Sequence, residues 1–166
     1  MPIQDNVYQT NEYGVMQLAG YDVEELLKRF GSPLIVLLED MIRKNCRAYL
    51  KQIAEYPRSR VYYASKAFLT TGFCKLIEQE GLGLDVVSLG ELHTALQAGF
   101  PVDRILLHGN AKGEPELRLA LSAGIGRIVI DNLDEIELLG TLAEELDCHA
   151  KVFVRITPGV KPSTHA

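Results

Sequence analysis

Apolar and polar residues follow one another in blocks, and from residue 34 onward the blocks predict strands and helices in turn. Short, continuous apolar runs are typical of parallel strands covered on both faces. These runs are residues 34–38, 61–64, 84–87, 105–107, 128–130 and 152–156. The intervening stretches repeat apolar residues at the spacing of a helix face. The predicted helices are residues 40–55, 69–80, 89–98, 114–123 and 133–146.

The regular spacing of these strands predicts an α/β fold with a parallel sheet. From residue 61 onward, a new strand begins every 21 to 24 residues, as in a (β/α) barrel or an open doubly wound sheet. A complete (β/α)₈ barrel needs about 250 residues, and this chain has 166. Nothing after Pro158 resembles a terminating element. We therefore expect a partial (β/α)₈ TIM barrel with about five of its eight strands, and keep a complete five-stranded open sheet as the alternative.

Charge and composition exclude several classes of protein. With 17 basic and 22 acidic residues, the net charge is −5 and no Lys/Arg cluster is present, which disfavours nucleic-acid binding. No apolar run reaches the roughly 18 residues that span a membrane. The 3 cysteines and 4 histidines lack the spacing of a metal site. We expect a cytoplasmic protein with a small-molecule ligand, no metal, and neither a membrane nor a nucleic acid as partner.

Lys66 is the first candidate for chemistry. It follows the predicted strand 61–64, and α/β folds place their active sites at the carboxyl ends of strands. A desolvated lysine is a good amine nucleophile for forming a Schiff base. The alternative is an ordinary solvated lysine at the start of a loop, because most lysines are exposed.

Other polar residues follow later strands and would share the same rim. His108 and Arg155 are the clearest, since an imidazole and a guanidinium suit a polar, anionic small molecule. His108 could equally be a hydrogen-bonded core residue, whereas an arginine after an apolar strand needs an anionic partner. Ser88 and Glu91 match the S-x-x-E capping box, and Asp85 could be a plain carboxylate at a strand edge.

Several motifs in order resemble the diaminopimelate decarboxylase family, whose members are pyridoxal 5'-phosphate (PLP) decarboxylases with an alanine-racemase-like barrel. The resemblance runs from about residue 30 to the last residue. The motifs are residues 31–36, 63–67, 81–92, 98–101, 108–112 and 154–160. Their order is specific, although each motif alone is weak. Leu89 and Ala111 depart from the usual family residues, a glycine and an asparagine.

This resemblance implies PLP-dependent decarboxylation of meso-2,6-diaminopimelate to L-lysine and CO₂. Lys66 would be the lysine that holds PLP, and Asp85, Glu91, His108 and Arg155 would lie on the cofactor side of the barrel mouth. The family works as a homodimer, so the resemblance also implies a homodimer when the protein is full length.

The resemblance further predicts how the chain is divided. Residues 1–38 would join a C-terminal β-domain of a full-length protein, and residues 39–166 would be the first part of the PLP-binding barrel. We expect the chain to be an N-terminal fragment that is inactive by itself. Three alternatives stay open: an ornithine, arginine or carboxynorspermidine decarboxylase of the same fold, a non-catalytic PLP-binding homologue, and an unrelated open-sheet binding protein.

Overall fold

The computed structural model describes residues 7–159. The chain divides into two compact units, one ending at Lys44 and the other beginning at Asn45. Each unit is described by itself below.

The first unit contains a small antiparallel meander and a short helix. The strands β1 (Tyr8–Thr10), β2 (Met16–Leu18) and β3 (Tyr21–Asp22) pair in sequence order. Helix α1 (Val23–Phe30) follows β3 directly, and its first turn is capped by the Asp22 carboxylate, which accepts from two backbone N–H groups. None of these elements was predicted from the hydrophobic pattern.

The predicted strand at residues 34–38 is wrong. This run has no regular structure and pairs with no strand in the described part of the chain. The Ile35 side chain is 88 % exposed. An extended run becomes a strand only when a neighbouring strand satisfies its backbone groups. Here the run instead leads into α2 (Glu39–Ile53), where the Leu38 carbonyl accepts from Ile42 N at 3.1 Å.

The second unit is built on a parallel sheet whose spatial order equals its chain order. The strands are β4 (Tyr62–Ala64), β5 (Gly83–Val86), β6 (Ile105–Leu107), β7 (Arg127–Ile130) and β8 (Val152–Val154). A doubly wound sheet reverses its strand order at a switch point, and this sheet has no reversal. The five strands predicted after residue 60 are therefore confirmed, and their order is that of a barrel wall.

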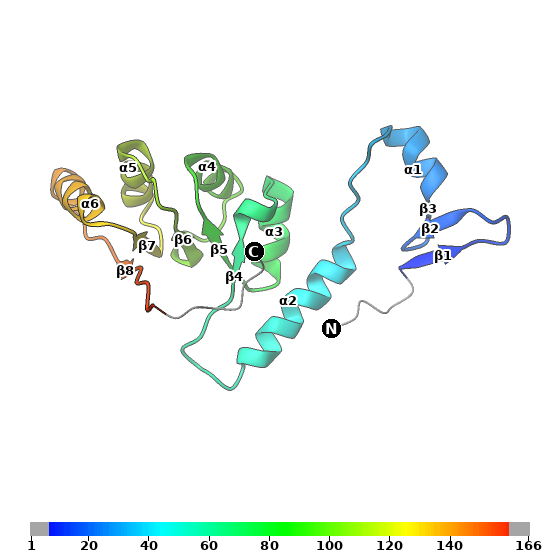
Figure 1. Cartoon of the computed structure of the whole chain (residues 1–166), viewed down its shortest axis with the longest axis horizontal. Helices are drawn as coiled ribbons and strands as arrows, with labels where there is room; N and C mark the ends of the chain where they lie inside the picture. Colours follow the sequence, from blue (N-terminus) through cyan, green and yellow to red (C-terminus); the bar gives the residue numbers. More distant parts are fainter. Residues whose placement is uncertain (1–6, 160–166) are drawn as a thin grey trace. The chain divides into compact units, whose positions relative to one another are not determined.

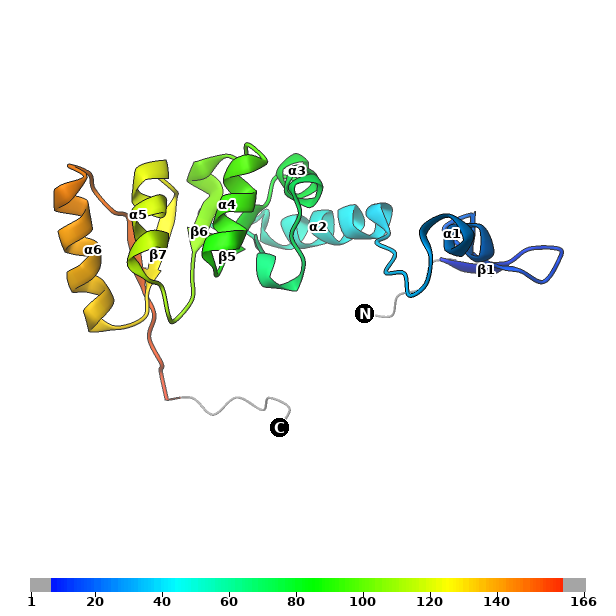
Figure 2. The same cartoon turned by 90° about the horizontal axis from the view of Figure 1, so that it is seen from above.

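Four helices cover one side of this sheet, as Figure 1 shows. They are α3 (Thr71–Gln79), α4 (Leu89–Gln97), α5 (Glu114–Ala123) and α6 (Leu133–Glu145). Seen from above, they stand side by side along the sheet (Figure 2). All four were predicted from the hydrophobic pattern, with bounds that differ by at most two residues. Helices on a single face also fit a barrel wall, because a doubly wound sheet is covered on both faces.

The hydrophobic core lies between the sheet and these helices. The central strands contribute one row of buried side chains and the helices another, and the largest of them are Ile77, Leu84, Leu92, Ile105, Leu107, Leu117 and Leu142. In-register neighbours of a parallel sheet point to the same side, so Ala64, Asp85 and Leu106 share the face away from the helices. Polar groups on that face are the ones that can meet a ligand.

Candidate functional site

Lys66 lies in the turn that follows the first strand of the sheet. The strand β4 ends at Ala64, and residues Ser65–Ala67 form a short 3₁₀ helix, η1, that packs against β5. The Lys66 side chain is exposed, whereas Ser65 is buried and its Oγ has no hydrogen-bond partner among the described residues. The predicted position of Lys66, directly after a strand, is confirmed.

Aromatic packing holds this turn in place. The Tyr63 hydroxyl donates to the Phe68 carbonyl at 2.9 Å, which closes the backbone around Lys66. Both rings also contact Phe73 of α3, with centroid distances of 4.9 and 5.4 Å. Burial raises the pKa of Tyr63, so the hydroxyl keeps its proton and remains a donor. The Lys66 backbone is thus fixed between β4 and α3.

Asp85 and His108 meet on the face of the sheet away from the helices. Asp85 is the third residue of β5 (Gly83–Val86), and β5 lies between β4 and β6. His108 continues β6, with its N–H donating to the Val86 carbonyl at 2.8 Å. Its Nδ1 lies 3.6 Å from Asp85 Oδ1, and the His108 side chain is 34 % exposed. His108 is therefore no core histidine, and it can reach a ligand.

Arg155 has the anionic partner that its position required. It follows β8, and its guanidinium donates to Asp131 Oδ1 at 3.0 Å. Asp131 directly follows β7, so the pair joins the ends of two adjacent strands. The Arg155 side chain is about half exposed and the Asp131 carboxylate is mostly covered.

Glu91 and Ser88 act as the cap of α4. Ser88 Oγ accepts from Glu91 N at 3.2 Å, and Glu91 Oε2 accepts from Val87 N at 2.8 Å. The predicted cap by Ser88 is confirmed, but the second bond of a capping box is not formed, because Glu91 accepts from Val87 N and not from the N–H of the N-cap Ser88. Glu91 lies beside the strand end of β5, but its carboxylate is engaged by the backbone.

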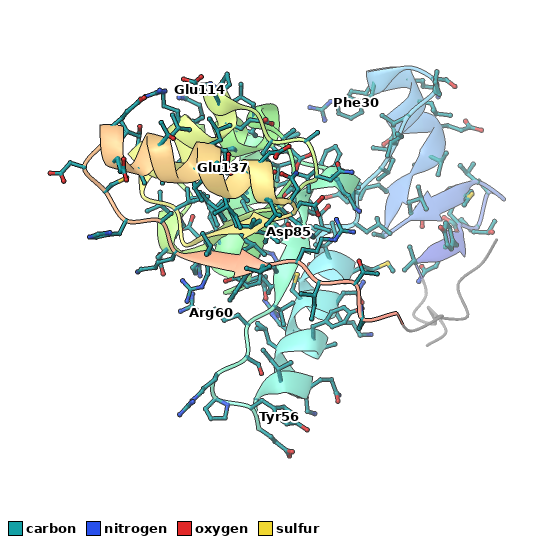
Figure 3. All side chains as sticks on the ribbon, turned by 60° about the vertical axis from the view of Figure 1, so that its left-hand side comes forward. Phe30, Tyr56, Arg60, Asp85, Glu114 and Glu137 are labelled. Atoms are coloured by element: carbon teal, nitrogen blue, oxygen red, sulfur yellow. The ribbon has the colours of Figure 1, made fainter. Side chains whose placement is uncertain are left out.

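These groups share one rim because all five strands run in the same direction. Figure 3 shows Asp85 on the sheet, whereas Glu114 and Glu137 belong to the helix layer. The rim presents one amine, one imidazole and one guanidinium, together with carboxylates that partner the last two. Such a set can attach a carbonyl compound and hold an anionic group.

The sequence analysis did not predict that Lys112 and Glu135 form a buried ion pair. Glu135 lies in the first turn of α6, where Asn132 Oδ1 caps the helix by accepting from Glu135 N at 2.9 Å. Both side chains are almost fully buried and their charged atoms lie 2.9 Å apart. No sequence pattern distinguishes a buried lysine from an exposed one, and the N-x-x-E signature was the only available signal.

Comparison with protein families identifies the family of this chain, which the geometry alone does not. The model of the pyridoxal-dependent decarboxylase family, pyridoxal binding domain, matches residues 39–166. The chain belongs to this family. The match covers the five-stranded sheet and the rim described above.

Curated relatives of this chain carry the name diaminopimelate decarboxylase. A diaminopimelate decarboxylase of Bacillus subtilis (strain 168) is 45 % identical over 93 % of this chain and 36 % of its own length. That of Bacillus methanolicus is 43 % identical over 95 % of this chain and 37 % of its own length. The chain thus spans somewhat more than a third of the curated relatives that it matches.

Solved structures agree with the fold. A diaminopimelate decarboxylase from M. jannaschii superposes with a TM-score of 0.84 at 33 % identity, covering 96 % of this chain and 38 % of the other. A lysine/ornithine decarboxylase from Vibrio vulnificus gives a TM-score of 0.71 at 27 % identity, over 84 % of this chain and 36 % of the other. The fold is therefore part of the TIM barrel of these decarboxylases.

The residues on the rim fit PLP. Lys66 offers an exposed amine for the aldehyde, and the Arg155 guanidinium offers a cation for an anionic group. Asp85 Oδ1 and Ser65 Oγ are buried without hydrogen-bond partners in the described part of the chain. Buried polar atoms are normally satisfied, so two unsatisfied atoms near the lysine turn indicate that this face meets a polar partner.

Two further absences hold for residues 7–159. No group of three or more His, Cys, Asp or Glu side chains is arranged to hold a metal ion. No helix in this range combines the length and the apolar character needed to cross a membrane.

Proposed function

We propose that the complete protein carrying this chain is a PLP-dependent decarboxylase that converts meso-2,6-diaminopimelate to L-lysine and CO₂. The observation that carries the proposal is the position of Lys66, an exposed amine fixed in a turn at the carboxyl end of the first sheet strand. An accessible amine at this position, within the residues that match a pyridoxal-binding domain, supports Lys66 as the residue that holds the cofactor.

Each rim residue has a part in this proposal. Lys66 would hold the cofactor through its side-chain amine. Asp85 and His108 bind on the cofactor side, and Arg155, oriented by Asp131, provides positive charge. Bound PLP supplies an electron-accepting ring for the electrons left when CO₂ departs. Glu91 supports the same wall through the backbone of Val87.

The names of the relatives favour diaminopimelate as the substrate. Relatives at 43 and 45 % identity carry the name diaminopimelate decarboxylase, whereas the lysine/ornithine decarboxylase is 27 % identical. A solved diaminopimelate decarboxylase from M. jannaschii also forms a co-complex with L-lysine, at a TM-score of 0.84 and 33 % identity to this chain. Ornithine, arginine or carboxynorspermidine would be the substrate in the second candidate function, which the more distant neighbour supports.

The assembly and location of the protein are also proposals. Residues 1–38 would join a C-terminal β-domain, and residues 39–166 would form the first part of the barrel. We expect a cytoplasmic homodimer whose partner is an amino-acid substrate, with no nucleic acid or membrane.

Substrate turnover tests this proposal. The complete protein should release CO₂ from meso-diaminopimelate in the presence of PLP, with much less release from ornithine or arginine. Lys66→Ala should abolish release, whereas Lys75→Ala, an exposed lysine on α3, should leave it unchanged. Preferred turnover of ornithine or arginine would favour the second candidate. PLP binding without turnover of any of these amino acids would favour a non-catalytic homologue.

A further inference from the structure

The loop after β6 is tied to the start of α6 by a buried ion pair. Lys112 and Glu135 are 1 % and 3 % exposed at their side chains, and Lys112 Nζ lies 2.9 Å from Glu135 Oε1. Lys112 Nζ also donates to the Gly109 carbonyl at 2.6 Å. Removing two charges from water has a high free-energy cost, so such a pair adds little net stability.

The Lys112–Glu135 pair contacts the backbone beside two other pairs, Asp85–His108 and Asp131–Arg155. On one side, Lys112 holds the carbonyl of Gly109, the residue next to His108. On the other side, Glu135 Oε2 accepts from the backbone N–H of Asp131 at 2.9 Å. Asp131 in turn holds Arg155 at 3.0 Å. These contacts, together with the intervening backbone, therefore connect the loop of His108 after β6 to the guanidinium after β8.

The backbone at Gly109 leaves this loop little freedom. Its φ is +109°, a conformation that favours glycine. An added Cβ would lie 3.1 Å from the Val87 carbonyl. The His108 loop is thus pressed against the end of β5 on one side and anchored by Lys112 on the other.

We propose that Lys112 and Glu135 are positioning residues that fix His108 and the Asp131–Arg155 pair for PLP binding. This inference rests on the proposed function, because it assigns a task to residues that would themselves not touch the cofactor. A purely structural role predicts that losing the pair changes stability alone. A positioning role predicts that it changes cofactor affinity at unchanged stability.

The test uses the complete protein without cofactor, titrated with PLP. In Lys112→Met with Glu135→Gln, both charges are removed together, because removing one alone leaves an uncompensated buried charge. The dissociation constant for PLP should rise about tenfold, in the range of energetic coupling between linked residues. The melting temperature of the cofactor-free protein should stay close to that of the wild type.

A matched control is available in an exposed group of ion pairs on α5 and α6. Arg118 of α5 pairs with Glu114 and Glu145, each at 2.8 Å, and the side chains of all three are partly exposed. Arg118→Met removes a link between α5 and α6, but Arg118 makes none of the contacts to Gly109 or Asp131 that the Lys112–Glu135 pair makes. Its PLP affinity should equal that of the wild type.

The outcomes separate this inference from the proposed function. If the wild type binds PLP and Lys66→Ala abolishes its covalent attachment, an unchanged affinity in the double variant overturns the positioning role only. If the wild type does not bind PLP, the proposed function fails and the inference fails with it. If the double variant does not fold, Glu135→Asp, which keeps both charges but shortens the reach of the carboxylate to the Asp131 N–H, provides the comparison, with unchanged affinity again contradicting the inference.

Discussion

At the residue scale, the rim residues are held in place by hydrogen bonds and ion pairs with neighbouring residues. The turn that carries Lys66 is closed by a tyrosine hydroxyl, and Arg155 is oriented by Asp131 at 3.0 Å. Asp85 keeps one buried oxygen without a hydrogen-bond partner among the described residues. A buried polar atom without a partner in the protein is common where a ligand completes the polar contacts. The chemistry of the rim therefore follows from a few contacts, each of which can be tested.

The half-buried side chain of Tyr63 and the buried thiol of Cys74 predict a loss of stability at alkaline pH. Burial raises the pKa of Tyr63 above 10.0 and that of Cys74 above 9.0. As the pH rises, both groups lose their protons first in the unfolded chain, so stability that is present below pH 9.0 declines above it. The melting temperature should fall between pH ~8 and pH ~10.5.

Single variants check the origin of this decline. Tyr63→Phe should reduce the fall in melting temperature between the two pH values, because its side chain no longer ionises. Tyr49→Phe, at a tyrosine that is 66 % exposed, should leave the fall unchanged. An equal pH dependence in both variants would show that Tyr63 contributes nothing to it.

The sequence predicted Lys66, His108 and Arg155 because each follows a continuous apolar run, and parallel strands bring such ends together. It did not predict that Lys112 is buried, because its partner Glu135 is 23 residues away and on another element. Long-range ion pairs depend on the packing of loops, which no local pattern encodes. The order of motifs implied the family, and that implication is confirmed for residues 39–166.

At the element scale, the hydrophobic pattern predicted helices and strands correctly where buried side chains recur regularly along the chain. It failed where they do not. The helices from residue 71 to residue 145 were predicted because each has a buried stripe. The strands β1 to β3 have two or three residues each and no buried side chain, so no apolar run marked them. Residues 34–38 gave the opposite error, an apolar run without a strand partner.

Gly83 of β5 is required by close packing at the start of the sheet. A Cβ at this position would lie 2.5 Å from the Tyr62 ring and 2.7 Å from the Arg104 carbonyl. The ring can move aside, but the backbone carbonyl cannot without disturbing the entry to β6. Gly83→Ala should therefore destabilise the protein by about 1–3 kcal/mol, as overpacking does, measured as a lower melting temperature.

Gly140 offers the matched control. It lies within α6, and nothing lies within 4 Å of the Cβ that an alanine would add. Gly140→Ala should raise stability by roughly 0.5–1 kcal/mol, because alanine is the better helix former. If Gly83→Ala were as harmless as Gly140→Ala, the packing described for β5 would be incorrect.

At the scale of the whole molecule, the described sheet has two edges, β4 and β8. The apolar residues of β8 are exposed, with Val152, Phe153 and Val154 at 43, 50 and 63 %. Unpaired edges with apolar side chains promote association between chains. In the barrel of the related decarboxylases, further strands and helices would continue from such an edge.

The isolated chain of 166 residues should therefore self-associate. Light scattering after size-exclusion chromatography should show masses that increase with protein concentration. Val154→Lys, which places a charge on the exposed edge, should reduce this association. Glu137→Lys, on the outer helix layer (Figure 3), should not. A monodisperse monomer at every concentration would contradict the exposed edge.

The central claim is that Lys66 holds the cofactor, and mass spectrometry after chemical reduction tests it most directly. The complete protein is incubated with PLP, treated with borohydride, digested and sequenced by tandem mass spectrometry. The account predicts one phosphopyridoxyl group on Lys66, lost in Lys66→Ala and retained in Lys75→Ala. Stoichiometric labelling at another lysine, or none at all, would contradict it.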